Sequence, residues 1–174
     1  MLYVIRHGKT DWNLKNKIQG RADIPLNDFG IQEANISKKL LYQTNLYKII
    51  SSPLIRAKKT AEIISNHKIP VITDVRLIER DFGEFEGLAK EDFDYSSFWN
   101  YSLNCHFDKA ESVQKLLDRV YNFLDEYKEV YEKNNVLVVT HSGVIPAICC
   151  YFKGIPKNNN IFTYHFKTCE IIKF

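Results

Sequence analysis

The chain alternates short apolar runs with helix-like segments, and this alternation constrains its fold more than any other feature. Apolar runs lie at Leu2–Ile5, Tyr47–Ser51, Val71–Thr73 and Val136–Thr140. Strands that alternate with helices are typical of right-handed crossovers in a mostly parallel sheet. The sequence therefore predicts an α/β fold.

Helix signals fill the segments between these runs. Ser52 followed by Pro53 is a good start signal, because serine caps helices and proline suits the first helical position. Within 111–133, apolar residues recur at spacings of three and four, which is typical of a helix with one buried face. The predicted helices cover about 28–42, capped by Asn27 or Asp28, then about 53–67, 111–133 and 144–152. Residues 161–166 and 169–173 are interpreted as a closing hairpin or a pair of edge strands.

Length and composition place the chain among ordinary globular proteins. Its 174 residues, 45% of them hydrophobic and 26% charged, are enough for one domain with a sizeable core. We therefore expect a single domain over residues 1–174. No apolar stretch approaches the roughly 20 residues of a membrane span. Arg6 and Lys9 interrupt the place where a signal peptide needs an apolar core, so we expect a cytoplasmic protein without a membrane partner.

Charge and cysteine content narrow the class of partner. The net charge is +3 and the lysines are scattered, which argues against a nucleic-acid-binding face. The four cysteines, at 105, 149, 150 and 169, lack the paired spacing of a zinc site and are interpreted as reduced thiols. A small-molecule partner is therefore expected. The sequence does not determine the oligomeric state.

Two of the predicted strands end in a histidine. Arg6 and His7 follow the first apolar run, and His141 follows the run that ends at Thr140. Ligands of open α/β sheets bind at the carboxyl ends of the strands, so these side chains would meet at one pocket. An Arg-His-Gly sequence alone is weak evidence, because a single histidine after a strand is more often structural. The turn that leads to Arg56, together with Glu79, could complete the pocket.

The chemistry of this set favours phosphate. Arg6 and Arg56 carry planar guanidinium groups that match phosphate oxygens, and the predicted helix starts after residues 52 and 143 add backbone donors. Two histidines without a close pair of carboxylates make a poor site for a hard metal, and neither an H-x-x-x-H nor a D-x-H pattern is present. We therefore expect an anion site without a metal or cofactor.

Each role in phosphoryl transfer has a candidate residue. A neutral nitrogen of His7 can attack phosphorus and form a phosphohistidine, which splits one displacement into two. The second histidine, His141, would be protonated beside phosphate anions, which raise its pKa, and would bind the transferring group. Glu79, if desolvated, would give a proton to the leaving alcohol and then take one from water.

These residues and their order resemble the histidine phosphatase superfamily, which has the phosphoglycerate-mutase-like fold, over nearly the whole chain. The resemblance implies a three-layer α/β/α sandwich and no metal requirement. It also implies that His7 is phosphorylated, that Arg6, Asn13, Arg56 and His141 contact phosphate, and that Glu79 is the acid-base residue. The four matching blocks are Arg6-His7-Gly8-Lys9-Thr10 with Trp12-Asn13, Ser51-Ser52-Pro53-Leu54-Ile55-Arg56-Ala57, Leu77 to Gly87, and Val138 to Val144.

Some positions depart from the commonest pattern of this superfamily. Lys9, Ser142 and Pro146 differ from it, and none of these changes removes a proposed catalytic group. Ser142 could narrow the approach to phosphate, and Gln19 and Gly20, in the loop after the first block, could contact the substrate. The other histidines match no block and are expected to be structural: His67, His106 and His165.

The segment 84–110 bears on the choice of substrate. It interleaves acidic residues (Glu84, Glu86, Glu91, Asp92, Asp94, Asp108) with aromatic ones (Phe85, Phe93, Tyr95, Phe98, Trp99, Tyr101, Phe107) and holds only two lysines, Lys90 and Lys109. A segment of this composition would bind a small polyanion poorly. It would interact better with a ring-bearing alcohol, which can stack on the aromatic side chains. An equally open interpretation is that the aromatic residues only pack the segment onto the domain.

The sequence therefore favours a phosphomonoesterase that hydrolyses a small phosphate ester. Within the superfamily the short chain looks most like the α-ribazole phosphatase group of cobalamin biosynthesis, which implies α-ribazole 5'-phosphate as the substrate. Two alternatives stay open: a phosphoglycerate-type mutase, and a catalytically silent phosphate-binding module.

Overall fold

The described residues form a five-stranded sheet in the order β3-β2-β4-β1-β5. A computed structural model describes residues 1–105, 107 and 109–174. Strands β3, β2, β4 and β1 run parallel to their neighbours, and only β5 is antiparallel, beside β1. The prediction of a mostly parallel sheet is confirmed.

The elements alternate along the chain as the sequence indicates. The strands are β1 (Leu2–Arg6), β2 (Leu46–Ser51), β3 (Val71–Thr73), β4 (Asn135–Thr140) and β5 (Ile171–Lys173). The helices are α1 (Asp11–Leu14), α2 (Asp28–Leu40), α3 (Ile55–Ser65), α4 (Tyr95–Phe98), α5 (Val113–Glu126), α6 (Lys128–Lys133) and α7 (Val144–Lys153).

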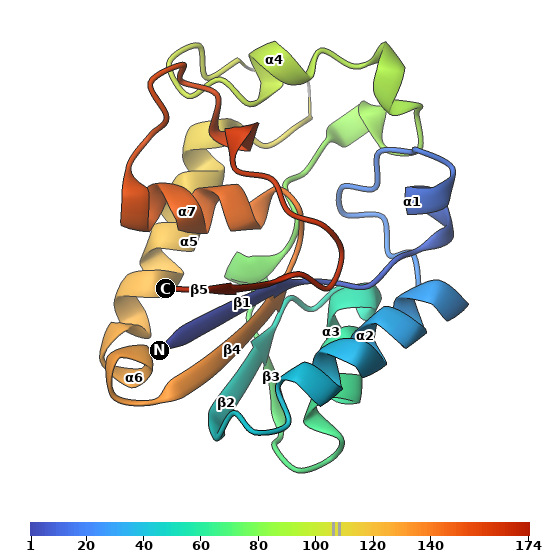
Figure 1. Cartoon of the computed structure of the whole chain (residues 1–174). Coiled ribbons are helices and arrows are strands. Elements are labelled where there is room, and N and C mark those ends of the chain that lie inside the picture. Colours follow the sequence, from blue (N-terminus) through green and yellow to red (C-terminus); the bar gives the residue numbers. More distant parts are fainter. Residues whose placement is uncertain (106, 108) are drawn as a thin grey trace.

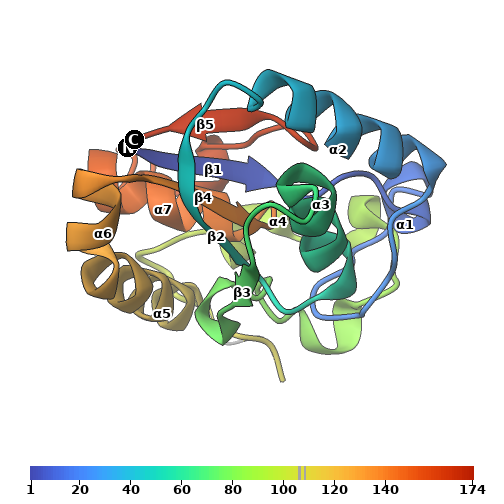
Figure 2. The same cartoon turned by 90° about the horizontal axis from the view of Figure 1, so that it is seen from below.

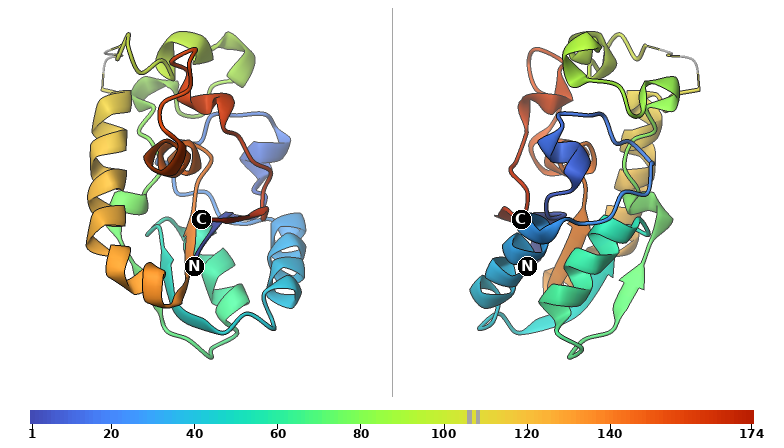
Figure 3. Two further views of the ribbon diagram at one scale, coloured as in Figure 1. Left: turned by 60° about the vertical axis from the view of Figure 1, so that its left-hand side comes forward. Right: turned by 90° about the vertical axis from the view of Figure 1, so that its right-hand side faces the viewer.

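The sheet lies between two layers of helices. Figures 2 and 3 show α2 and α3 on one face, and α5 and α7 on the other. Side chains of a strand alternate between the two faces. Val138 accordingly belongs to the core under α5 and α7, whereas Leu137 and Val139 belong to the core under α2 and α3. The chain has the three-layer α/β/α architecture.

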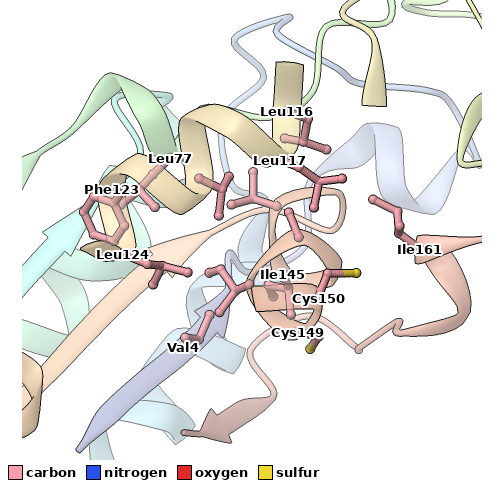
Figure 4. Close-up of a cluster of buried hydrophobic side chains, with 14 of the residues drawn as sticks. Val4, Leu77, Leu116, Leu117, Phe123, Leu124, Ile145, Cys149, Cys150 and Ile161 are labelled. Atoms are coloured by element: carbon pink, nitrogen blue, oxygen red, sulfur yellow. The ribbon is translucent and has the colours of Figure 1, made fainter. Parts of the chain in front are cut away.

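Helices α5 and α7 form the larger of the two cores. The buried face of α5 includes Leu116, Val120 and Phe123, which is the face that the spacing of three and four predicts. Figure 4 shows Cys149 and Cys150 of α7 beside Ile145 in this cluster. Burial raises the pKa of the Cys149 thiol to about 11 and that of Cys150 to about 12. Both cysteines are core residues.

The helix after the Ser52-Pro53 turn begins later than predicted. Helix α3 starts at Ile55, and its N-cap residue is Leu54, which makes no side-chain capping bond. Instead, the Ser52 hydroxyl accepts a hydrogen bond from the Leu54 N–H and lies 2.6 Å from Nε2 of His141. The Ser52 hydroxyl therefore contacts a residue far away in the sequence as well as the local backbone, and Ser52 is not the N-cap residue of α3.

The single predicted helix 111–133 is two helices. Helix α5 ends at Glu126 and α6 begins at Lys128, with Tyr127 between them. Helix α6 turns toward the start of β4, where the amino group of Met1 donates hydrogen bonds to the carbonyls of Tyr131 and Asn134. The apolar repeat continues across Tyr127 because both helices are partly buried, so it does not reveal the break.

Of the predicted closing hairpin or pair of edge strands, the segment 169–173 is confirmed as the edge strand β5, and the strand predicted over 161–166 is wrong. Ile161–Thr163 is a 3₁₀ turn, and β5 alone joins the sheet from this end of the chain. The Ile161 N–H donates to the carbonyl of Trp99, and Phe162 stacks on the Trp99 ring at 4.9 Å between centroids. Packing against a distant segment therefore overrides the β propensity of 161–166.

Two loop regions cover the carboxyl ends of the parallel strands. The segment that contains α4 and the segment that follows α7 lie together above the sheet in Figure 3. Antiparallel bridges join Asn100 to Asn160 and Lys17 to Ala89. In the described part of the chain, the helices are too short or too polar to cross a membrane. The predictions for His106 and Asp108 lie outside the described residues.

Candidate active site

The ends of three neighbouring strands bring the two histidines together. In the sheet, Arg6 lies beside Thr140 and Ser51 lies beside Val139. The His7 N–H continues this ladder by donating to the Thr140 carbonyl at 2.9 Å. As a result, the rings of His7 and His141 have centroids only 5.1 Å apart.

Gly8 allows a close backbone contact just after His7. A Cβ atom at Gly8 would lie 2.4 Å from the carbonyl oxygen of Gly30, and one at Gly30 would lie 2.1 Å from that of Lys9. The turn after β1 is thus packed directly against the first turn of α2. Any larger residue at position 8 would push this turn away from α2 and move His7 with it.

His7 is held with one ring nitrogen bonded to the backbone and the other facing Arg56. Its Nδ1 lies 2.7 Å from the Gly8 carbonyl oxygen, which can only accept, so Nδ1 carries the proton. Nε2 therefore keeps a lone pair, toward which the Arg56 Nε–H points at 3.3 Å. Burial lowers the pKa of His7 well below its ordinary value, and the charges of Arg56 and Arg6 lower it further. The free molecule thus presents a neutral imidazole.

The guanidinium of Arg56 is fixed by two loop carbonyls. Nη1 donates to Ala22 O and Nη2 donates to Gly20 O, each at 2.7 Å. The side chain is fully buried, and burial lowers its pKa to about 10, against the opposing effect of nearby carboxylates. The guanidinium group of Arg56 is therefore already held in one orientation in the ligand-free molecule.

His141 is buried directly beside His7. Burial lowers its pKa well below the ordinary value, and the charge of Arg56 lowers it further. Its Nδ1 has no hydrogen-bond partner among the described residues. The expectation of a protonated His141 concerned the phosphate-bound state; in the free molecule the ring is neutral.

Glu79 lies at the other side of the pocket, beside the start of α7. Its carboxylate accepts hydrogen bonds from the N–H groups of Arg80 and Gly143 and from the Ser142 hydroxyl, at 2.8–3.2 Å. A Cβ atom at Gly143 would lie 2.5 Å from Glu79 Oε1, so this close contact needs glycine. Ser142 thus contacts Glu79 in the wall of the pocket.

Some of the backbone donors expected at the helix starts are bound to protein acceptors. At the start of α7, the Gly143 N–H is bound to Glu79. At the start of α3, the Ile55 N–H donates to Asp23 at 2.7 Å and the Leu54 N–H donates to Ser52. Protein acceptors satisfy these groups, so the arginines are the main cations for an anion.

The remaining predicted residues also line the pocket. Nη1 of Arg6 donates to the Phe166 carbonyl at 3.1 Å, while its Nε has no partner among the described residues. Asn13 completes the capping box of α1 by accepting from the Thr10 N–H, and Gln19 accepts from the Thr10 hydroxyl. Among the described residues, the amide N–H groups of both side chains have no partner. Gly20 lines the pocket through its backbone.

The cavity has a volume of about 270 Å³, which is at the small end for ligand pockets. Its predicted lining residues are Arg6, His7, Asn13, Gln19, Gly20, Arg56, Glu79 and Ser142. Three further lining residues, Lys90, Tyr95 and Trp99, belong to the segment 84–110 that the sequence connected with the choice of substrate. The sequence did not single out the remaining ones, which are Lys17, Ile18, Phe82 and Phe162. Phe82 falls in the third matched block, and the aromatic pattern of 84–110 flagged the composition of that segment without showing which residues face the ligand.

The segment 84–110 both packs on the domain and lines the pocket. Phe93 and Phe98 are buried among other rings, whereas Tyr95 and Trp99 reach the cavity. Two of the acidic residues of the segment lie outside the pocket lining: Glu84 is exposed and pairs with Lys109, and Glu86 binds the 20–22 loop. Lys90 is the charged residue that this segment contributes to the pocket lining.

No group of three or more histidine, cysteine or acidic side chains is placed to hold a metal ion within residues 1–105, 107 and 109–174.

Comparison with known proteins places this geometry in a family. The profile of the histidine phosphatase superfamily (branch 1) matches residues 2–174. The chain belongs to this superfamily. It is 35% identical over 152 residues to the "Uncharacterized phosphatase PhoE" of Bacillus subtilis. The aligned region covers 87% of this chain and 76% of the relative.

Solved structures of the superfamily share its fold. A phosphoserine phosphatase from Entamoeba histolytica, in complex with 3-phosphoglyceric acid, has a TM-score of 0.84 at 30% identity and covers 98% of this chain and 87% of its own. An α-ribazole phosphatase from Shigella flexneri has a TM-score of 0.83 at 26% identity, with the same coverage. The resemblance to the α-ribazole phosphatase group is therefore supported, alongside relatives named for other phosphate esters.

Proposed function

We propose that this histidine phosphatase hydrolyses a small phosphate monoester through a phosphohistidine on His7. The observation that carries the proposal is the geometry of His7. Its Nδ1 proton is held by the Gly8 carbonyl, and its Nε2 lone pair faces the guanidinium of Arg56. A neutral, oriented nitrogen beside a fixed cation is what attack on a phosphate group requires.

In the first step, Nε2 of His7 attacks phosphorus and the bond from phosphorus to the ester oxygen breaks. Arg6 and Arg56 bind the equatorial oxygens, and the N–H groups of Asn13 add donors. The proposed proton donor to the leaving oxygen is Glu79 in its carboxylic acid form, which becomes the carboxylate that takes part in the second step. His141 takes part as a donor once the dianion of the ester raises its pKa.

In the second step, Glu79 takes a proton from water and the resulting hydroxide attacks the phosphohistidine. The nitrogen–phosphorus bond breaks, and His7 and inorganic phosphate are regenerated. No atom of a metal or cofactor enters this scheme. A mutase would instead return the phosphate to a second hydroxyl of the substrate, so release of inorganic phosphate separates the two reactions.

For the alcohol, α-ribazole 5'-phosphate is the first candidate. Tyr95, Trp99 and Phe162 form an aromatic side of the cavity, on which a ring-bearing alcohol can stack. The likeness to an α-ribazole phosphatase supports this choice.

A second candidate is a phosphate ester with an additional negative charge. Lys17 and Lys90 also line the cavity, in addition to the two arginines that suffice for one phosphate. Burial lowers the pKa of Lys90, and the charge of Arg6 lowers it further, which is a cost that a bound carboxylate would offset. A structural relative holds 3-phosphoglyceric acid, which carries such a carboxylate.

A panel of esters tests these proposals. Wild type and His7→Ala are incubated with ribazole, sugar, serine and glycerate phosphates, with and without EDTA, and inorganic phosphate is measured. We expect release by wild type that is insensitive to EDTA and is abolished in His7→Ala. Unaltered turnover in the variant would contradict the role of His7. A wild type that turns over none of the esters would favour a binding module, and loss of activity in EDTA would contradict the metal-free reaction.

Lys90→Met separates the two candidate substrates. If Lys90 binds a second anionic group, KM for phosphoserine or phosphoglycerate should rise by about tenfold, since a hydrogen bond between charged groups is lost. KM for an ester without a second charge, such as p-nitrophenyl phosphate, should then stay the same. An equal change in both KM values would reject the second candidate.

A further inference from the structure

The carboxylate of Glu86 binds the backbone of the loop after α1. Oε1 accepts a hydrogen bond from the Arg21 N–H at 2.7 Å, and Oε2 accepts one from the Ala22 N–H at 2.9 Å. Two adjacent N–H groups are thus held by the two oxygens of a single carboxylate. Glu86 itself lies outside the set of residues that line the cavity.

The same loop holds Arg56 through its carbonyl groups. Gly20 O and Ala22 O accept from the two Nη atoms of Arg56, and the Nε–H of this arginine then faces Nε2 of His7. Each contact in this series is a directional hydrogen bond. The series therefore runs from Glu86 through residues 20–22 to Arg56 and ends at the proposed nucleophile.

The Glu86 carboxylate packs tightly against the backbone of the loop at Gly20. Gly20 has φ of +50°, in the left-handed region that favours glycine. A Cβ atom there would lie 2.0 Å from Oε1 of Glu86. A short ladder between the two segments adds further restraint, because Ile18 exchanges hydrogen bonds with Leu88 and Gly87. A change in the position of Glu86 would therefore break its hydrogen bonds to the loop or shift the loop with it.

Glu86 also acts on Arg56 through its charge. Burial lowers the pKa of Arg56, and the carboxylates that oppose this effect are Glu79, Asp23 and Glu86. An exposed glutamate two residues earlier, Glu84, makes neither contact and pairs with Lys109 at the surface. The chain thus offers a matched pair of glutamates, one in the series of contacts and one outside it.

We infer that Glu86 is a positioning residue for the reaction: by fixing the Gly20–Ala22 backbone, it sets the orientation in which Arg56 meets phosphate beside His7. The inference rests on the proposed function, because it assigns to Arg56 the phosphate oxygens that the transfer requires. Glu86 itself touches neither substrate nor the reacting atoms.

The test compares Glu86→Gln with Glu84→Gln. A glutamine at position 86 keeps the size of the side chain but presents an N–H group to one of the two loop N–H donors. We expect the Kd of orthovanadate, measured by calorimetry, to rise by about tenfold or more, because a hydrogen bond to a charged group is weakened. The Kd for Glu84→Gln should equal that of wild type. Unchanged vanadate affinity in a folded Glu86→Gln protein would overturn the inference.

A double-mutant cycle distinguishes positioning of Arg56 from general support of the fold. In an Arg56→Lys background the guanidinium group that the loop holds is absent, so Glu86→Gln should have little further effect on vanadate affinity. If the two effects multiply instead, Glu86 acts independently of Arg56 and the inference is wrong. Thermal unfolding of each variant shows which proteins are folded.

Gly20→Ala supplies a second route to the same loop if Glu86→Gln does not fold. Its Cβ atom should displace Glu86 and reproduce the loss of vanadate affinity, and wild-type affinity in a folded Gly20→Ala protein would count against the inference. Vanadate binding does not require turnover. Failure of the proposed hydrolysis, seen with the ester panel, is thus distinguishable from failure of this inference.

Discussion

The two sides of the cavity are held in place by different forces. On one side, Arg56 and the 20–22 loop are fixed by short hydrogen bonds between charged groups and backbone. On the other, Tyr95, Trp99 and Phe162 are held by the packing of rings. Hydrogen bonds fix the relative orientation of the bonded groups within narrow limits, whereas packed aromatic rings can adopt several relative orientations.

Under the proposed function, this difference matches the two parts of a phosphate ester. The phosphate group is the same in every substrate, and the charged side presents one fixed geometry to it. The alcohol differs between substrates, and the aromatic side can adapt to it with small movements of rings. We therefore expect changes on the charged side to affect every ester, and changes on the aromatic side to affect only some.

The largest expected effect comes from Arg56→Lys on the charged side. A lysine cannot reach both loop carbonyls and also present a planar fork, so kcat/KM should fall by about 100- to 1,000-fold for every ester tested. Steady-state kinetics measure this loss. Arg76→Lys is the matched control, because Arg76 pairs with Asp74 and Glu126 away from the cavity. A loss confined to some esters would remove the distinction between the two sides.

The pH dependence of stability is a second test of the charged side. The pKa values of His7 and His141 lie well below their ordinary value in the folded protein, whereas the unfolded chain takes up these protons near pH 6.5. Unfolding therefore binds protons as the pH falls, and stability is lost below that value. We expect the free energy of unfolding to fall by about 1.4 kcal/mol per pH unit for each histidine below about pH 6.

Urea unfolding between pH 5.0 and 7.5 measures this slope. The window lies above the range in which carboxylates titrate in the unfolded chain. His7→Gln should remove about half of the slope, since one of the two histidines is lost. A wild-type protein equally stable at both ends of the window would contradict the neutral, buried state of the histidines.

The smallest effect is expected from Phe162→Leu on the aromatic side. Phe162 stacks on Trp99 with 22° between the ring planes. Its loss should raise KM about two- to tenfold for a ring-bearing ester, because an aromatic pair contributes a modest free energy beyond its buried area. A small aliphatic ester should be unaffected. In the control Phe152→Leu, the lost ring stacks on Phe174 away from the cavity. An equal rise for both esters would mean that Phe162 shapes the whole site.

The sequence revealed the parts of the site whose position follows from local signals. His7 and His141 were placed because each follows an apolar strand, and neighbouring strand ends meet at one edge of a parallel sheet. Arg56 and Glu79 followed from the ordered blocks of the superfamily. The catalytic roles of these four residues await the experiments above.

The aromatic side and the lysines could not be placed in the same way. Trp99 and Phe162 meet only because two irregular segments fold over the same strand ends, and neither segment has a periodic pattern that predicts a contact. Lys90 reaches the cavity because its N–H is bound to Asn16 of the opposite loop. Similarly, the Ser52 signal was interpreted locally, whereas its hydroxyl lies against a histidine 89 residues away. Contacts between loops that are distant in the sequence cannot be predicted from the sequence of either loop alone.

The raised pKa values of three cysteines have a practical consequence for enzymology. Alkylating reagents attack thiolates, and burial holds Cys149, Cys150 and Cys169 in the thiol form, with pKa values of about 11, 12 and 12. A reaction centred on histidine does not need a thiolate. Under the proposed function, phosphate release should therefore persist in iodoacetamide. This reagent inactivates phosphatases that use a cysteine nucleophile, so it would remove their background from a crude extract.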